Sequence, residues 1–156
     1  MYKLFRYAIF QMDAEKAHDF TLQCLKMTAH PLFYPLFKSL IDTPKGLSKT
    51  VMGINFSNLI GLAAGADKNG EAIDGFGMLG LGFIEVGTVT PFAQDGNAKP
   101  RQFRLIEAEG IINHNGFNNK GIDYLIENVK STHYKGGIGI NIGKNKWTPL
   151  ERGKDD

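Results

Sequence analysis

The sequence has little of several features that would indicate a particular class of protein. It contains one cysteine, Cys24, in 156 residues, which excludes an internal disulfide framework and a metal cluster built from cysteines. It has no H-x-x-x-H pair and no carboxylate cluster of metal-binding type, so no metal site is predicted. No apolar run approaches the roughly 20 residues of a membrane-spanning helix, and the first residues lack the pattern of a signal peptide.

The net charge is also small, and the charged residues are unevenly placed. The net charge is +2, which gives no indication of a nucleic-acid partner. Residues 1–47 hold six Lys and Arg against four Asp and Glu, together with eight of the seventeen aromatic residues. An aromatic-rich, slightly basic amphipathic segment indicates contact with a membrane surface or a partner.

Helical periodicity dominates the first part of the chain. Apolar spacing predicts helices over residues 3–11 and about 14–29, with Asp13 as the N-cap of the second. Residues 31–41 form a short, strongly apolar stretch that also favours a helix. The sequence therefore predicts a helical appendage over residues 1–41.

The pattern changes after residues 42–46, where Pro and Gly indicate a linker. Residues 42–156 alternate apolar runs of buried-strand type with amphipathic helical segments. The predicted elements are a hairpin around Gly53, strands at 59–63, 82–88 and 136–143, helices at 70–79 and 118–130, and a second hairpin that turns near Glu109 and Gly110. This order predicts right-handed parallel units and an α/β fold.

The number of predicted strands is small for a closed fold. A (β/α)8 TIM barrel takes about 250 residues, and this chain stops after its third or fourth strand. A self-contained open sheet is one alternative. We expect instead that the chain is truncated and that residues 42–156 are the first half of a (β/α)8 barrel, with functional loops at the C-terminal ends of its strands.

The loop "GLAAGADKNG", residues 61–70, follows the first predicted core strand and has no bulky side chain between Leu62 and Lys68. Small residues let a flat ligand approach the backbone, whose N–H groups can then donate to it. Lys68 can offset negative charge on a ring or on a bound carboxylate. Two alternatives are a solvated lysine and an Ala-Gly pair that serves only tight packing.

Polar residues follow the later strands as well. Thr88 and Thr90 end the second strand, and "INHNGFNN" at 112–119 holds four asparagines. The amide side chain offers a donor and an acceptor together, which suits the imide-like edge of a pyrimidine or a flavin, although Asn-Gly also favours a simple turn. Asn141 lies within a predicted buried strand, so its amide needs a partner from the protein or a ligand.

Together and in order, these motifs resemble a known family. "GLAAGADKNGEAID", "EVGTVTP", "KPRQFRL", "INHNGFNN" and "GINIGKNK" resemble the N-terminal half of a class 2 dihydroorotate dehydrogenase, the membrane-associated, quinone-using type. The resemblance covers essentially the whole chain. It implies oxidation of dihydroorotate to orotate with FMN, with electrons passed to a membrane quinone, in de novo pyrimidine (UMP) biosynthesis.

The resemblance also implies roles for individual residues. FMN would lie across the top of the barrel, in contact with Ala64, Gly65, Ala66, Asp67, Lys68, Thr88 and Asn141. Dihydroorotate or orotate would contact Lys68, Asn113, His114, Asn115, Gly116 and Phe117. Residues 1–41 would form the mouth of a quinone tunnel at the membrane, and the quinone site would be lined by His18 and Arg104.

Some expectations concern what departs from the family or is missing. Asn115 stands where family members often have methionine or tyrosine, so its side-chain contact is expected to differ. The family's catalytic base, a serine in this class, lies beyond residue 156, so residues 1–156 alone are expected to be inactive. We expect a monomer bound peripherally to the cytoplasmic face of a bacterial inner membrane. The alternatives are another FMN-dependent or phosphate-binding (β/α)8 enzyme and a non-catalytic membrane-surface module.

Overall fold

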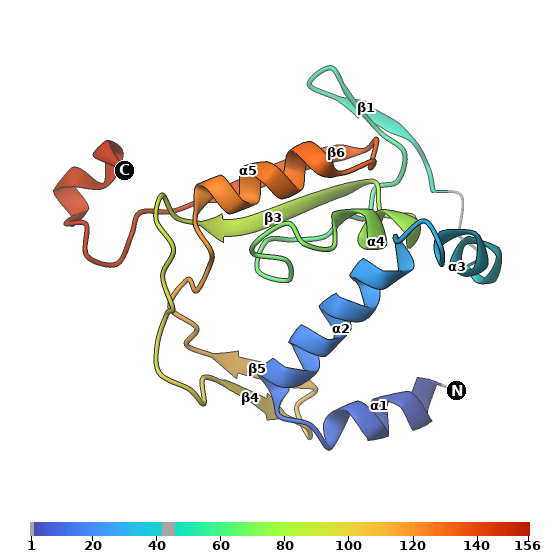
Figure 1. The fold of residues 1–156 in the computed structure, drawn as a ribbon, viewed down its shortest axis with the longest axis horizontal. Helices are drawn as coiled ribbons and strands as arrows, with labels where there is room; N and C mark the ends of the chain where they lie inside the picture. The colour runs from blue at the N-terminus through green and yellow to red at the C-terminus, as the bar shows by residue number, and fades with distance from the viewer. Residues whose placement is uncertain (1, 42–45) are drawn as a thin grey trace.

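The computed structural model describes residues 2–41 and 46–156 and begins with three helices (Figure 1). These are α1 (Tyr2–Phe10), α2 (Ala14–Thr28) and α3 (Tyr34–Leu40). Asp13 caps α2 as predicted, because its Oδ1 accepts the backbone N–H groups of Glu15 at 3.0 Å and Lys16 at 3.1 Å. All three predicted helices are confirmed. Most of the predicted linker, residues 42–45, lies outside the described residues.

Both predicted hairpins are confirmed. Strands β1 (Lys49–Val51) and β2 (Ile54–Phe56) pair antiparallel through a two-residue turn. Both turn residues have positive φ, 53° at Met52 and 79° at Gly53, as two-residue hairpin turns commonly require. The second hairpin joins β4 (Gln102–Leu105) to β5 (Gly110–Asn113).

A parallel arrangement of strands forms the centre of the fold. Strand β3 (Phe83–Val89) pairs in parallel with β6 (Gly137–Ile142), and on its other side Leu62 forms a parallel bridge with Ile84. Helices α4 (Ile73–Met78) and α5 (Ile122–Ser131) provide the crossovers, and Figure 1 draws α5 along β3 and β6. The core contains buried side chains from strand β3 and both helices, namely Ile73, Ile84, Val86, Val89 and Leu125.

Three predicted elements differ in extent from the structure. Residues 59–63 form a single parallel bridge instead of a full strand, and Ile60 is 67% exposed, because within the described residues no further strand covers that edge. Helix α4 begins at Ile73 because the Asp67 carboxylate binds the backbone of the preceding turn. Helix α5 begins at Ile122 because Gly121 has a φ of 86°, which is incompatible with a right-handed helix.

Helix α2 is packed against the rest of the chain along its length. In Figure 1 it runs from the β4–β5 hairpin to α4, and Ala17 on this helix is 4% exposed. A Cβ atom on Gly75 of α4 would lie 2.3 Å from the carbonyl oxygen of Leu25. The two helices therefore meet at a position where the sequence has no side chain. Within the described residues, no helix is both long enough and apolar enough to cross a bilayer.

We predict that Gly75→Ala lowers the free energy of unfolding of the full-length protein by about 1–3 kcal/mol, because the added methyl group forces α2 away from α4. Gly110→Ala is the matched control, since a Cβ there would meet only the Ala108 oxygen at 3.7 Å. Denaturant unfolding of both variants measures the difference. Equal stability of the two variants would contradict the close helix contact.

Candidate functional site

The loop after Leu62 is fastened to the end of β3. The backbone N–H of Gly65 donates to the Gly87 oxygen at 2.8 Å, and the Gly87 N–H donates to the Asp67 oxygen at 3.1 Å. The Asp67 side chain is fully buried, and its carboxylate accepts the N–H groups of Glu71 and Ala72. Asp67 therefore shapes the loop, and these two hydrogen bonds hold its carboxylate within the protein.

Gly65 leaves an open space at this loop. Its φ is 106°, its backbone is exposed, and a Cβ built on it would meet no atom of residues 2–41 or 46–156 within 4 Å. The flanking Ala64 and Ala66 add only methyl groups. The backbone here is accessible to a flat ligand, as the small residues of the loop predicted.

Lys68 is half-buried and folds back over its own loop. Its Nζ donates to the Gly65 carbonyl oxygen at 3.0 Å. Burial lowers the pKa of Lys68, and the nearby Arg101 cation lowers it further. Lys68 is therefore not a fully solvated lysine, which removes one of the two alternatives for this loop.

Thr88 and Asn141 meet at the ends of β3 and β6. The Thr88 hydroxyl donates to Asn141 Oδ1, and Asn141 Nδ2 donates to Glu85 Oε1 at 3.3 Å. The amide on the predicted buried strand therefore has partners from the protein, and its side chain is half-buried. Together with the Gly65–Gly87 hydrogen bond, this pair brings the predicted cofactor residues to one edge of the parallel strands.

The predicted substrate segment, Asn113–Phe117, leaves β5 and is held mainly by its backbone. His114 N donates to the Arg101 oxygen at 3.0 Å, and the Gln94 side chain donates to the carbonyl oxygens of Gly116 and Phe117. The His114 ring stacks on Phe103 with centroids 6.0 Å apart.

Two side-chain oxygens, Asn115 Oδ1 within this segment and Asn118 Oδ1 just after it, are buried without a hydrogen-bond partner among the described residues. Buried acceptors of this kind indicate a missing donor. Asn113 Oδ1, in contrast, accepts the Asn115 N–H in a long contact of 3.4 Å.

The two predicted quinone-site residues line different pockets. His18 on α2 lines a small pocket of about 70 Å³ together with Lys68, Gln102 and Asn118. Burial lowers the pKa of His18, and Lys68 lowers it further.

Arg104 instead lines a groove between α1 and the β4–β5 hairpin. Its guanidinium donates to the Met12 oxygen at 2.7 Å and lies 4.7 Å from the centre of the Phe10 ring. The structure therefore brings His18, but not Arg104, next to Lys68.

Reasoning from the sequence missed a buried polar network below the site. Asn145 is 0% exposed and Asn119 is 7% exposed. Both amides donate to the Thr90 hydroxyl, at 3.2 Å and 2.8 Å, and that hydroxyl donates to the Phe92 oxygen at 2.7 Å. The only available signal was the density of asparagines, which does not distinguish these two from solvated neighbours.

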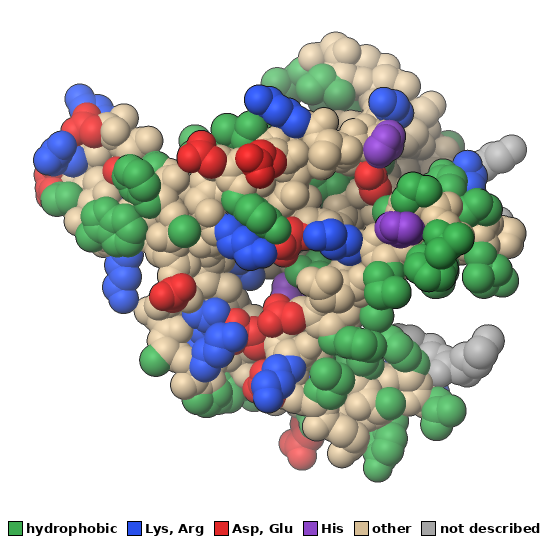
Figure 2. Space-filling model, viewed as in Figure 1, with side chains coloured by type: hydrophobic (Ala, Val, Ile, Leu, Met, Phe, Trp, Pro, Cys, Tyr) green, Lys and Arg blue, Asp and Glu red, His purple; other side chains and the backbone are tan. Residues whose placement is uncertain are grey.

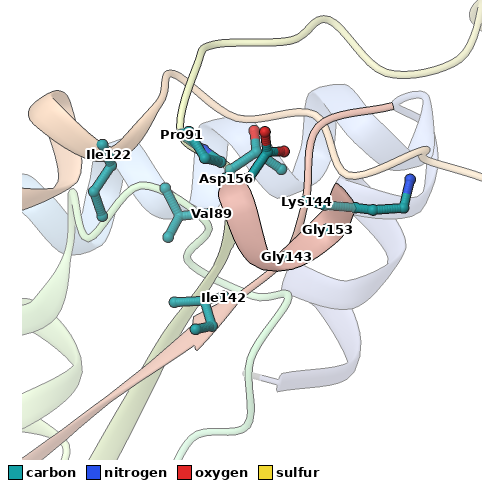
Figure 3. A pocket seen from close by; sticks show the side chains of 9 residues that line it. Val89, Pro91, Ile122, Ile142, Gly143, Lys144, Gly153 and Asp156 are labelled. Atoms are coloured by element: carbon teal, nitrogen blue, oxygen red, sulfur yellow. The ribbon is translucent and has the colours of Figure 1, made fainter. Parts of the chain in front are cut away.

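An apolar pocket of about 360 Å³ adjoins this network (Figure 3). Val89, Ile122 and Ile142 line one side, and Asp156 lies beside Pro91. Among the described residues, no group of three or more His, Cys, Asp or Glu side chains could hold a metal ion.

Comparison with known proteins identifies the family. The family model described as "Dihydroorotate dehydrogenase" matches residues 46–156. The chain belongs to the dihydroorotate dehydrogenase family. The resemblance stated from the motifs is therefore confirmed.

Relatives within the dihydroorotate dehydrogenase family match the whole chain. A "Dihydroorotate dehydrogenase (quinone)" of Haemophilus influenzae (strain PittGG) is 80% identical over all 156 residues, which cover 46% of that protein. The protein of the same name from Mannheimia succiniciproducens is 65% identical, again over 100% of this chain and 46% of the relative. The chain thus spans somewhat less than half the length of these curated relatives.

A solved structure supports the same fold. A crystal structure of Eimeria tenella DHODH in complex with ferulenol is 38% identical and aligns with a TM-score of 0.77, over 92% of this chain and 39% of that one. Both the family and this likeness identify the parallel strands as the N-terminal part of a (β/α)8 barrel, which residues 1–156 do not close. The predicted fold class is confirmed.

We predict that Thr90→Val lowers the free energy of unfolding of the full-length protein by about 1–3 kcal/mol, because two buried amides lose an acceptor and Phe92 loses a donor. Thr50→Val on the exposed β1–β2 hairpin is the control and should change stability by less than about 0.5 kcal/mol. Urea unfolding measures both. A neutral Thr90→Val would mean that the hydroxyl has no net role in stability.

Proposed function

We propose that the full-length protein oxidises dihydroorotate to orotate with FMN and passes the electrons to a membrane quinone, in de novo pyrimidine biosynthesis. The observation that carries this proposal is the position of Lys68, a half-buried cation next to the open backbone of Gly65 at the C-terminal ends of parallel strands. The 80% identity to a protein named for this activity supports it.

The residues at this edge fit FMN. The open space at Gly65 and the small side chains of Ala64 and Ala66 suit a flat ring system, and Thr88 and Asn141 carry hydrogen-bonding groups at the same edge. Bound FMN would supply the two-electron redox chemistry. The contribution of this chain is to orient the ring and, through Lys68, to stabilise negative charge near it.

The segment Asn113–Phe117 and Asn118 fit a pyrimidine. The unpartnered oxygens of Asn115 and Asn118 require N–H donors, and dihydroorotate has two ring N–H groups. Its carboxylate requires a cation, and Lys68 lines the same pocket as Asn118. Asn115, which stands where family members often have methionine or tyrosine, would thus make a different side-chain contact, through its amide.

The helical appendage, residues 1–41, fits a membrane surface and a quinone entrance. In Figure 2, hydrophobic side chains gather at the end of the molecule that carries α1 and α3. Large apolar side chains there are well exposed, among them Leu4, Tyr7, Leu36 and Leu40. Such a face binds the lipid interface by burying apolar area. His18 on α2 lines a pocket with Lys68, and Arg104 on β4 donates to the Met12 oxygen between α1 and α2.

The relatives that match the whole chain come from bacteria. We accordingly propose a monomer attached peripherally to the cytoplasmic face of the bacterial inner membrane.

A flavin spectrum of the full-length protein tests this function, and Lys68→Ala tests its chemistry. Dihydroorotate should bleach the flavin absorbance without oxygen, and a quinone should restore it. Lys68→Ala should slow the bleaching about 10²-fold or more, the usual cost of losing one stabilising group at a developing charge. Lys130→Ala, an exposed lysine of α5, is the control.

Stopped-flow absorbance measures both rates. A protein that binds no flavin, or whose flavin is not bleached by dihydroorotate, would refute the function. A Lys68→Ala rate equal to that of the Lys130→Ala control would refute the role of the lysine alone.

A further inference from the structure

Arg101 is a buried cation that joins three segments of the chain. Its side chain is 4% exposed. Nε and Nη2 donate to the Glu15 carboxylate of α2, with the shortest contact at 2.6 Å. Nη1 donates to the carbonyl oxygens of Asp95 at 2.6 Å and Asn97 at 2.9 Å. The backbone oxygen of Arg101 accepts the N–H of His114 at 3.0 Å.

Asn97 completes a ring of hydrogen bonds around the Asn113–Phe117 segment. Its backbone N–H donates to the Asn115 oxygen at 2.9 Å, and its Nδ2 donates to the His114 oxygen at 2.6 Å. A Cβ on Gly96 would lie 2.2 Å from the Asn115 oxygen and 2.8 Å from Arg101 Nη1. There is therefore no room for a side chain at Gly96, because the loop at 95–97 packs directly against the Arg101 guanidinium and the Asn113–Phe117 segment.

The position of this guanidinium depends on Glu15. A buried charge needs a paired counter-charge, and Glu15, itself 7% exposed, supplies it. Hydrogen bonds from Arg101, and then from Lys99, hold the pKa of Glu15 below its usual value. Lys99 reaches the same Glu15 oxygen at 3.2 Å, but its side chain is 64% exposed.

We propose that Glu15 and Arg101 are positioning residues of the dihydroorotate site. The Glu15 carboxylate on helix α2 holds the Arg101 guanidinium. Arg101 in turn holds the segment Asn113–Phe117, directly through its own backbone oxygen and indirectly through Asn97. Substrate affinity is thereby set in part from the helical appendage, outside the barrel segment. The inference rests on the proposed function, because it assigns Asn113–Phe117 to the substrate.

The test measures orotate binding by flavin spectral titration in the full-length FMN-loaded protein. Arg101→Lys keeps the charge but cannot donate to Glu15, Asp95 and Asn97 at once. Glu15→Gln keeps a hydrogen-bond acceptor and removes the counter-charge. Each change should raise the Kd of orotate and the KM of dihydroorotate about tenfold or more through misplacement of the segment. FMN content and the rate of flavin reoxidation by quinone should stay within about twofold of the wild type, which corresponds to about 0.4 kcal/mol.

Two matched variants separate positioning from general stability. Lys99→Gln removes a cation from the same Glu15 oxygen without touching the loop, and it should leave the orotate Kd within about twofold. Asn97→Ala leaves the buried ion pair in place and removes the side-chain bond to His114, so it should raise the Kd even if the ion-pair variants fold poorly. The double variant Arg101→Lys/Glu15→Gln should weaken binding less than the sum of the single changes, because both belong to one network.

Asn113→Ala, within the segment itself, is the reference for direct substrate contact. An orotate Kd near wild type in Arg101→Lys, Glu15→Gln and Asn97→Ala, beside a raised Kd in Asn113→Ala, would overturn the positioning role and leave the proposed function standing. A wild-type protein that binds FMN but no orotate would overturn the proposed function and, with it, this inference.

Discussion

Backbone hydrogen bonding at the C-terminal end of β3 fixes the candidate flavin site. On one side, Gly87 bonds to Gly65 and Asp67 of the lysine-bearing loop. On the other, the strand pairs with β6 and places Thr88 against Asn141. Gly65, Asp67 and Asn141 are each hydrogen-bonded to β3, which itself carries Thr88, so this strand fixes four of the seven predicted cofactor residues.

Local features of the fold could be predicted from the sequence. Asp13 caps its helix through neighbours two and three positions away, and the turn at Gly53 is recognisable from a residue that tolerates positive φ. The small residues before Lys68 predicted an accessible backbone in the same way, and the open space at Gly65 agrees with that prediction. The apolar run at residues 59–63 predicted a buried strand, but Ile60 is exposed. Within the described residues no further strand lies beside it.

The rest of the site depends on contacts between distant positions. The Thr88–Asn141 pair is separated by 53 residues and the Arg101–Glu15 pair by 86. Neither separation leaves a periodic or composition signal, because side-chain pairing across a fold follows from packing and not from local propensity. Asn145 illustrates the limit: flanked by lysines, it looks like a surface residue, yet it is wholly buried. The resemblance to a family predicted ligand contacts, but it did not predict these side-chain pairs or the burial of Asn145.

The distance of 86 residues between Glu15 and Arg101 has a consequence for how the chain matures. At a synthesis rate of about 5–20 residues per second, α2 waits roughly 4–17 s before its counter-charge leaves the ribosome. During that interval its carboxylate stays hydrated, and the face that will meet Gly75 and β4 has no complete partner. Closing so long a loop lowers the conformational entropy of the chain before the contact between Glu15 and Arg101 can stabilise it. Helix α2 is thus held by this ion pair only after all of the residues between Glu15 and Arg101 have been made.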